Sequence, residues 1–251
     1  MAATGSAELR DVYEGQYSAG DADAARYGRW RALCAEGKAD HVTTLAAALE
    51  NRPRSLVEVG CGDGSLLEAL AARGFADSLH GFDISERAVQ IVRGRGVAQR
   101  VERFDGTSLR AAADAYDLGV LSHVLEHIPD PAPLLRETAR TCRALIVEVP
   151  LEDNRSASRP AAQQGREAIG HLHRFSRADV HRLASDAGLQ VIGELADPLP
   201  LRVHRFWAIG PAARVLASGK AVARRALFTV APRTAERAFT VHYAALLTAR
   251  S

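Results

Sequence analysis

The chain contains few cysteines and has a small net charge. Its 251 residues include three cysteines, Cys34, Cys61 and Cys142, and the formal net charge is +2 at pH 7. An odd number of widely spaced cysteines argues against a disulfide framework and indicates reduced thiols, as in a cytosolic protein. A net charge this small creates no overall field to attract nucleic acid, so we expect no nucleic-acid partner.

Long apolar runs are missing as well. Nowhere do roughly 18 uncharged apolar residues follow one another, as a membrane-spanning helix requires. Residues 1–15 lack the basic segment and the apolar core of a signal peptide. We therefore expect a cytoplasmic protein. Hydrophobic residues make up 47% of the sequence, enough at this length for the core of one globular domain.

After Pro53, the sequence alternates regularly between strand and helix patterns. Short apolar runs predict strands over residues 55–59, 78–84, 99–105, 116–121, 143–150, 190–195 and 238–247. Helical spacing predicts helices over residues 65–74, 85–96, 131–142 and 176–189. This alternation implies a doubly wound α/β fold with parallel strands, and a binding crevice at their carboxyl ends.

A glycine-rich loop, "VEVGCGDGSLL", connects the first predicted strand to the first predicted helix. Its glycines are Gly60, Gly62 and Gly64, and Glu58 precedes them. Glycine lets a backbone turn tightly and approach a ligand closely, although an ordinary tight turn is the alternative. Two carboxylates favour a binding loop: Asp83 ends the second strand, where it can accept both ribose hydroxyls, and Asp105 ends the third.

The motifs together resemble the class I S-adenosylmethionine-dependent methyltransferases. The spacing G-x-G-x-G differs from the dinucleotide pattern and is similar to motif I of that family, and "FDIS" and "FDG" resemble its next two loops. "YDLGVLSHVLEHIPDP" and "GHLHRFSRADVHRLASDAGLQV" resemble the ubiquinone-biosynthesis-like, type 11/23 subgroup of small-molecule methyltransferases. The resemblance covers residues 53–196 and implies S-adenosylmethionine as cofactor, with S-adenosylhomocysteine as product.

The resemblance also implies which residues bind the cofactor. Glu58 would orient the loop or the methionine end, Asp83 would bind the ribose, and Asp105 would hold the adenine amino group. Ile84 would pack on adenine, and the backbone near Leu121 and Ser122 would meet the methionine amino group. The complete set is Glu58, Gly60, Cys61, Gly62, Gly64, Asp83, Ile84, Asp105, Gly106, Leu121 and Ser122.

The resemblance implies an α/β, Rossmann-like, mostly parallel seven-stranded sheet. We divide the chain into an N-terminal helical cap (1–52), a cofactor-binding core (53–197), a basic helical insert between strands six and seven (198–236) and a final strand segment (237–251). The cap contains four aromatic residues, Tyr13, Tyr17, Tyr27 and Trp30. We expect a monomer or a homodimer.

The expected reaction transfers a methyl group to a hydroxyl or amine of a small-molecule acceptor, such as a secondary metabolite, a sugar or a quinone-type compound. No Asn/Asp-Pro-Pro-Tyr/Phe motif follows the fourth strand, which argues against methylation of nucleobase or glutamine nitrogen atoms. A nicotinamide oxidoreductase is disfavoured by the glycine spacing and by Asp105. A non-catalytic binding module with this fold has no need of Asp83 and Asp105.

Residues 123–127, "HVLEH", match the H-x-x-E-H pattern of a zinc-peptidase helix. Pro129 and Pro131 leave room for about two helical turns at most, so we reject that interpretation and assign no metal. At the end of the fourth strand, His123 is instead a candidate general base or acceptor-binding group. We expect Glu126 and His127 to hold the loop by pairing with backbone amides.

Further histidines follow the fifth strand. His171 is the second candidate base, with a capping or solvated histidine as the alternative. We expect His173 and His181 to lie on the surface.

The insert has no acidic residue between Pro198 and Ala235. It contains the basic residues Arg202, Arg205, Arg214, Lys220, Arg224, Arg225 and Arg233, with apolar residues at helical spacing between several of them. A lid over the acceptor pocket is the favoured interpretation. Peripheral contact with a membrane, or with a lipid-linked or phosphorylated substrate, is the alternative.

Overall fold

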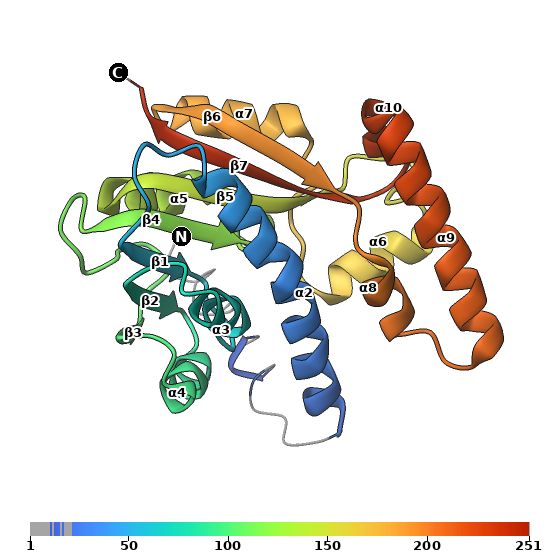
Figure 1. Ribbon diagram of the computed structural model, residues 1–251, viewed down its shortest axis with the longest axis horizontal. Coiled ribbons are helices and arrows are strands. Elements are labelled where there is room, and N and C mark those ends of the chain that lie inside the picture. The colour runs from blue at the N-terminus through green and yellow to red at the C-terminus, as the bar shows by residue number, and fades with distance from the viewer. Residues whose placement is uncertain (1–10, 12, 16, 18–21, 251) are drawn as a thin grey trace.

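The computed structural model describes residues 11, 13–15, 17 and 22–250 and contains one seven-stranded sheet with helices on both faces (Figure 1). The strands are β1 (Ser55–Val59), β2 (Ser78–Asp83), β3 (Arg100–Arg103), β4 (Tyr116–Ser122), β5 (Cys142–Leu151), β6 (Leu189–Asp197) and β7 (Val241–Ala249). The helices are α2 (Ala22–Ala46), α3 (Ser65–Ala72), α4 (Glu86–Arg95), α5 (Pro131–Thr141), α6 (Pro160–Ala168), α7 (Arg177–Asp186), α8 (Leu201–Phe206), α9 (Pro211–Val230) and α10 (Pro232–Ala238). A single 3-10 turn, η1, spans Leu125–His127.

The strand order is β3-β2-β1-β4-β5-β7-β6. Strands β1 to β5 pair in parallel, and β7 runs antiparallel to both β5 and β6. The order reverses between β1 and β4, so the crevice at the topological switch point opens beside the glycine loop. The predicted doubly wound, mostly parallel sheet is confirmed.

Two apolar cores flank the sheet. On one face, α2, α3 and α4 cover a core that includes Val42, Leu67 and Val89 (Figure 1). On the other, α5 and α7 cover a core that includes Leu135 and Val180. Strands β4 and β5 are buried along nearly their whole length, which explains their almost continuous apolar sequences.

Side-chain caps fix the helices that follow the strands. The Ser85 hydroxyl accepts from Ala88 N at the start of α4. Ser176 begins α7 with a reciprocal capping box in which Asp179 is the partner. These caps place the loops after β2 and β5 at defined positions beside the crevice.

The C-terminal part differs from the sequence prediction in one boundary. The last strand begins at Val241, not at residue 238, because Pro232–Ala238 forms α10. Proline at the first helical position favours this extra turn of helix, and the apolar pattern of residues 238–240 alone gave no sign of it. The insert thus contains three helices, and these lie on the side of the sheet where the parallel strands end (Figure 1).

None of the helices in the described part of the chain is long and apolar enough to cross a membrane. The thiols of Cys34, Cys61 and Cys142 are all free.

Candidate active site at the carboxyl ends of the strands

The glycine loop turns sharply between β1 and α3. Gly60, Gly62 and Gly64 all have positive φ angles. A Cβ atom on Gly60 would lie 2.5 Å from Val124 Cγ2, and one on Gly62 would lie 2.7 Å from the Tyr17 hydroxyl oxygen. Glycine is therefore required at both positions by backbone conformation and by space.

Asp83 ties this loop to the end of β2. Its Oδ2 accepts from Gly62 N at 2.8 Å, and its Oδ1 accepts from Ser85 N at 2.9 Å. Burial raises the pKa of the Asp83 carboxyl, although these backbone donors oppose the rise. Each oxygen keeps further acceptor capacity, which suits a pair of ribose hydroxyls.

Glu58 is buried in β1 directly before the loop. Its Oε2 is buried and has no hydrogen-bond partner in the part of the chain that the structure describes. Burial raises the pKa of this carboxyl to about 8, and Lys38 partly offsets the rise. A buried orphan carboxyl oxygen fits a site that a cationic or hydrogen-bonding ligand group completes.

Ile84, Asp105 and Gly106 meet where β2 and β3 end. The half-buried Ile84 has its Cδ1 atom 3.6 Å from the position of a Cβ on Gly106. Asp105 Oδ1 accepts from Thr107 N, Thr107 Oγ1 and Ser108 N within 2.7–2.8 Å. Burial would raise the pKa of Asp105, but these donors lower it, so the group is a carboxylate with Oδ2 available.

Cys61, Leu121 and Ser122 bring no free side-chain group to the site. The Cys61 thiol joins the core beneath the loop, and the Leu121 side chain is fully buried. The Ser122 hydroxyl donates to Glu148 Oε2 at 3.1 Å. Any contact of these three residues with a cofactor therefore has to use the backbone.

Residues of the N-terminal segment lie against the glycine loop. From the sequence we expected this segment only to be a helical cap with several aromatic residues. Tyr17 contacts the backbone at Gly62, and the Tyr13 ring packs edge-on against His127 with ring centroids 5.9 Å apart. Burial raises the pKa of both phenols, so both remain neutral hydrogen-bonding groups. Glu14 accepts from Glu86 N at 2.7 Å and so covers the first turn of α4.

Asp63 anchors the middle of the loop and was not predicted. It accepts from Arg31 Nε of α2 at 2.8 Å and from the Ser65 hydroxyl at 2.7 Å. Burial would raise its pKa, but Arg31 lowers it and keeps Asp63 ionised. The cap helix and the glycine loop are thereby joined by a partly buried ion pair.

A buried polar network follows β4. His123 adopts a positive φ of 58°, and its Nδ1 lies 3.0 Å from Glu126 Oε1. Its Nε2 lies 3.3 Å from His242 Nδ1 of β7. Burial lowers the pKa of His123 to about 4, with Lys38 and His242 acting in the same direction, so the ring is neutral near pH 7.

Glu148 of β5 is the centre of this network. Its Oε1 lies 3.1 Å from His41 Nδ1 and 3.4 Å from His242 Nδ1. Burial would raise the pKa of Glu148, but the histidine partners hold it well below its usual range. Burial also lowers the pKa of His41, yet hydrogen bonds with Asp197 and Glu148 outweigh this and raise it to about 9.

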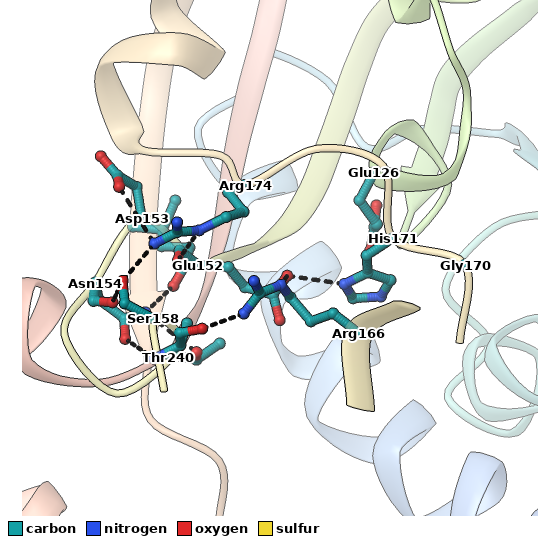
Figure 2. Close-up of polar contacts among 12 residues, drawn as sticks. Glu126, Glu152, Asp153, Asn154, Ser158, Arg166, Gly170, His171, Arg174 and Thr240 are labelled. Atoms are coloured by element: carbon teal, nitrogen blue, oxygen red, sulfur yellow. Dashed lines mark hydrogen bonds and ion pairs between the residues drawn. The ribbon is translucent and has the colours of Figure 1, made fainter. Parts of the chain in front are cut away.

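His171 lies in the loop after β5, where Glu152 orients it. Its Nδ1 lies 2.8 Å from Glu152 Oε2, as Figure 2 shows beside Arg166. Arg174 Nε donates to the Glu152 carbonyl at 3.1 Å and holds the same turn. Nδ1 donates to the carboxylate, so Nε2 is the ring nitrogen left for another group.

The loop after β4 is a single 3-10 turn, so "HVLEH" forms no helix with two histidines on one face. Glu126 and His127 do hold the loop, but through other atoms than expected. The Glu126 carboxylate binds the His123 ring, and His127 Nδ1 donates to the Gly170 carbonyl at 3.1 Å. The Glu126 carbonyl accepts from Leu172 N at 2.7 Å, which joins this turn to the loop of His171.

His181 is exposed, as expected, whereas His173 is half-buried. His173 Nε2 donates to the Ile128 carbonyl at 2.8 Å, and its ring stacks on Phe175. Leu172 and Arg174, on either side of His173, gave no sequence signal for this packing.

Comparison with known proteins agrees with this geometry. A family model described as "Methyltransferase domain" matches residues 27–194, and the chain belongs to this family. A ubiquinone biosynthesis O-methyltransferase from Alkalilimnicola ehrlichii is 30% identical over 142 residues, covering 52% of this chain and 56% of that protein. For this enzyme and its counterparts from Nitrosomonas europaea and Bordetella avium, the match spans 40% to 56% of their length.

Solved structures share the fold at low sequence identity. A geranyl diphosphate C-methyltransferase from Streptomyces coelicolor A3(2), solved with Mg²⁺, geranyl diphosphate and S-adenosyl-L-homocysteine, aligns with a TM-score of 0.61 at 13% identity, covering 85% of this chain and 79% of that one. The [4+2]-cyclase SpnF aligns with a TM-score of 0.57 at 19% identity, covering 85% and 80%. A cyclase among these neighbours means that the fold alone does not fix the reaction.

Proposed function

We propose that this protein transfers the methyl group of S-adenosylmethionine to a hydroxyl, or an amine, of a small-molecule acceptor. The observation that supports it best is the set of groups around the glycine loop. The loop closes to within contact distance of Val124 and Tyr17, Glu58 has an orphan buried oxygen, and Asp83 and Asp105 are carboxylates with acceptor capacity. Ubiquinone O-methyltransferases among the relatives favour oxygen of a quinone-type or related metabolite as the acceptor atom.

S-adenosylmethionine would supply an activated methyl group on a sulfonium centre. The protein's own task is then to align the acceptor and to exclude water. Tyr13 and Tyr17 cover the loop from the N-terminal segment, and the rings of His123 and His171 lie in the loops after β4 and β5. We propose both histidines as groups that bind the acceptor oxygen or accept its proton.

Cofactor binding is tested by calorimetry with S-adenosylhomocysteine. We expect saturable binding by the wild type and none by Asp83→Ala, because the variant loses the ribose acceptor and the anchor of Gly62. Asp153→Ala, which removes an exposed carboxylate after β5, is the matched control and should bind like the wild type. Equal affinity of D83A and wild type would contradict the cofactor assignment. Mass spectrometry of any ligand retained through purification separates a methyltransferase from a nicotinamide enzyme and from an empty binding module.

The outward face of α9 favours a second candidate acceptor, one that is lipid-linked or held at a membrane surface. Val215, Leu216, Val222 and Val230 are 63% to 80% exposed. They share one side of the helix, opposite the buried Ala221, with Arg214 and Lys220 along its edges. An apolar stripe between basic residues is typical of helices that lie on anionic membranes.

A further inference from the structure

Three basic side chains gather between the start of α6 and one flank of α9. Lys220 and Arg224 are one helical turn apart in α9, so their side chains leave the helix on the same flank. Arg159 is the N-cap residue of α6. Among the ion pairs and side-chain hydrogen bonds of the described residues, none involves these three cationic groups.

Backbone contacts bring the start of α6 to the end of α10. Ser156 N, shortly before Arg159, donates to the Ala238 carbonyl at 3.1 Å. Phe239 follows directly, and Arg224 lies over its buried ring with Cζ 4.9 Å from the ring centroid. This stacking orients the Arg224 guanidinium before any ligand binds, on the side of α9 that faces the start of α6.

The charges of these groups act on one another. The pKa of Lys220 is lowered, chiefly by Arg224, with burial and Arg159 acting in the same direction. Burial lowers the pKa of Arg224, and Arg159 adds to this effect. Like charges one helical turn apart destabilise the folded chain, and a bound anion would remove that cost. The insert supplies no carboxylate for this purpose, because residues 198–235 contain no acidic residue.

His204 of α8 supplies a second, independent sign of a missing ligand. Helix α8 packs against α9, and the pKa of His204 is lowered first by burial and then by Arg224 and Lys220. Its Nε2 atom is buried and has no hydrogen-bond partner within the described residues. A buried polar nitrogen without a partner is costly. With Nε2 protonated, the ring would donate to an anionic oxygen and remove this cost.

From this arrangement we infer that Arg159, Lys220 and Arg224, with His204 beside them, bind a phosphate or diphosphate group of the acceptor. Arginine matches the oxygens of a phosphate with two parallel hydrogen bonds, and lysine binds them as a point charge. A phosphate monoester carries about two negative charges at pH 7, and three cations suit that charge better than they suit a single carboxylate.

The other basic residues of the insert differ from this cluster. Arg225 pairs with Asp197 at 2.8 Å, and Arg233 Nη1 lies 3.7 Å from Glu236 Oε2. These two arginines therefore already have acidic partners. Arg214 is exposed and lies roughly one and a half turns from the cluster along α9. It supplies a matched control of the same charge on the same helix.

The role of this site in acceptor recognition rests on the proposed methyl transfer, whereas anion binding itself does not. Helix α6 connects the cluster to the loop of His171. Arg159 precedes its first turn, and Arg166 Nε lies 3.8 Å from Glu152 Oε2, which orients His171 (Figure 2). The stretch from Arg159 to Arg166 spans about 10 Å of helix. The acceptor would thus be elongated, with its phosphate at one end and its reacting atom near His171.

The test is a calorimetric titration of the full chain with inorganic pyrophosphate, without divalent metal or cofactor. We expect one saturable site per chain. Affinity should fall by about 10- to 100-fold in each of Arg159→Ala, Lys220→Ala and Arg224→Ala, because each loses a charge-assisted contact. Arg224→Lys should lose less, since it keeps the charge but not the paired donors. His204→Gln should weaken binding severalfold, and Arg214→Ala should bind pyrophosphate like the wild type.

Absence of saturable pyrophosphate binding by the wild type, or equal losses in R214A and K220A, would overturn the inference. Arg159 and Lys220 are exposed, so their variants should stay folded, and circular dichroism checks this for each variant. Calorimetry with S-adenosylhomocysteine on the same samples reports the cofactor site separately. A chain that binds pyrophosphate but no S-adenosylhomocysteine contradicts the proposed methyl transfer alone, and the reverse result contradicts the anion site alone.

Two soluble probes distinguish the possible sources of the phosphate. Phenyl phosphate carries the group on a small metabolite-like molecule, and monomeric dihexanoyl phosphatidic acid carries it as a lipid headgroup. Binding of either probe with the same loss in K220A supports the site, and the tighter probe identifies the source. Binding to phosphatidylglycerol vesicles without any affinity for pyrophosphate would assign these cations to a membrane surface and overturn the inference.

Discussion

His123 and His171 are both candidates for contact with the acceptor, but their surroundings differ. Both nitrogens of His123 already have partners in Glu126 and His242, and burial holds its pKa near 4. His171 has one partner, Glu152, and a free Nε2. Residue by residue, His171 is therefore the better placed to contact an acceptor, and His123 the better placed to pass a proton along a network.

We expect His123→Ala and His171→Ala each to lower kcat by about 10²- to 10⁴-fold, the usual range for a lost acid–base group. The affinity for S-adenosylhomocysteine should stay within about threefold, because neither ring touches the glycine loop. Steady-state kinetics, with an acceptor that the wild type methylates, measures kcat. Calorimetry measures the affinity for S-adenosylhomocysteine. His181→Ala is the matched control, and wild-type turnover in both H123A and H171A would remove their proposed roles.

The low pKa of His123 also predicts how the activity depends on pH. The ring is neutral above about pH 5 and gains a proton only as the pH falls through about 4. His123 should therefore produce no acidic limb in the kcat/KM profile between pH 6 and 8.

At the scale of elements, α9 is a long helix with little buried surface. Ala221 is its one fully buried residue, and Arg225 forms an ion pair with Asp197 at 2.8 Å that fixes the helix beside β6. Arg224 lies over the Phe239 ring. Leu227 and Phe228 pack the inner side of the helix against the core, while the apolar residues of its outer side are exposed.

We expect the protein to co-sediment with vesicles containing phosphatidylglycerol and to do so less at high salt, because basic residues flank the apolar stripe. Val215→Ser with Val222→Ser should reduce the pelleted fraction severalfold, since both side chains are exposed and stabilise no core. Ile192→Ser, at an exposed apolar residue on β6, is the matched control. If the wild type does not pellet, α9 serves only as a lid.

For the molecule as a whole, the protonated ring of His41 links α2 to the sheet by ion pairs. It lies in α2, beside Glu148 of β5 and Asp197 of β6, and its pKa is raised from 6.5 to about 9. The folded state therefore keeps a proton that the unfolded chain releases. This stabilisation is complete below pH 6.5 and is lost as the pH rises through about 9. Glu58, whose pKa is raised from 4.5 to about 8, acts in the same direction at lower pH.

We expect the melting temperature to fall as the pH rises from 6.5 to 9, and to fall less in His41→Gln. At about 1.4 kcal/mol per pKa unit, the contribution of His41 has an upper limit of roughly 3–4 kcal/mol. Differential scanning calorimetry at pH 6 and pH 9.5 measures the difference, with His181→Gln as control. Parallel pH dependence in H41Q and wild type would show that the His41 charge does not link cap and sheet.

The sequence alone determined the core fold and the cofactor side of the site. The β-strands from Ser55 to Asp197 and the helices α3, α4, α5 and α7 follow from local patterns, whereas α6 (Pro160–Ala168) was not predicted. The glycine loop lies within one strand–turn–helix unit. Asp83 and Asp105 end neighbouring parallel strands, so topology brings them to one edge without any further information. The roles of these residues toward the cofactor stay predictions until binding is measured.

Only the tertiary structure decided the acceptor side. His41, His123, Glu148 and His242 come from four separate elements, and Glu126 meets His171 across two loops. Tyr13 and Tyr17 contact His127 and the glycine loop, respectively, across a long separation in sequence. Short-range periodicity indicates which face of a helix or strand is apolar. Contacts between segments that are distant in sequence form only when the chain folds and brings those segments together.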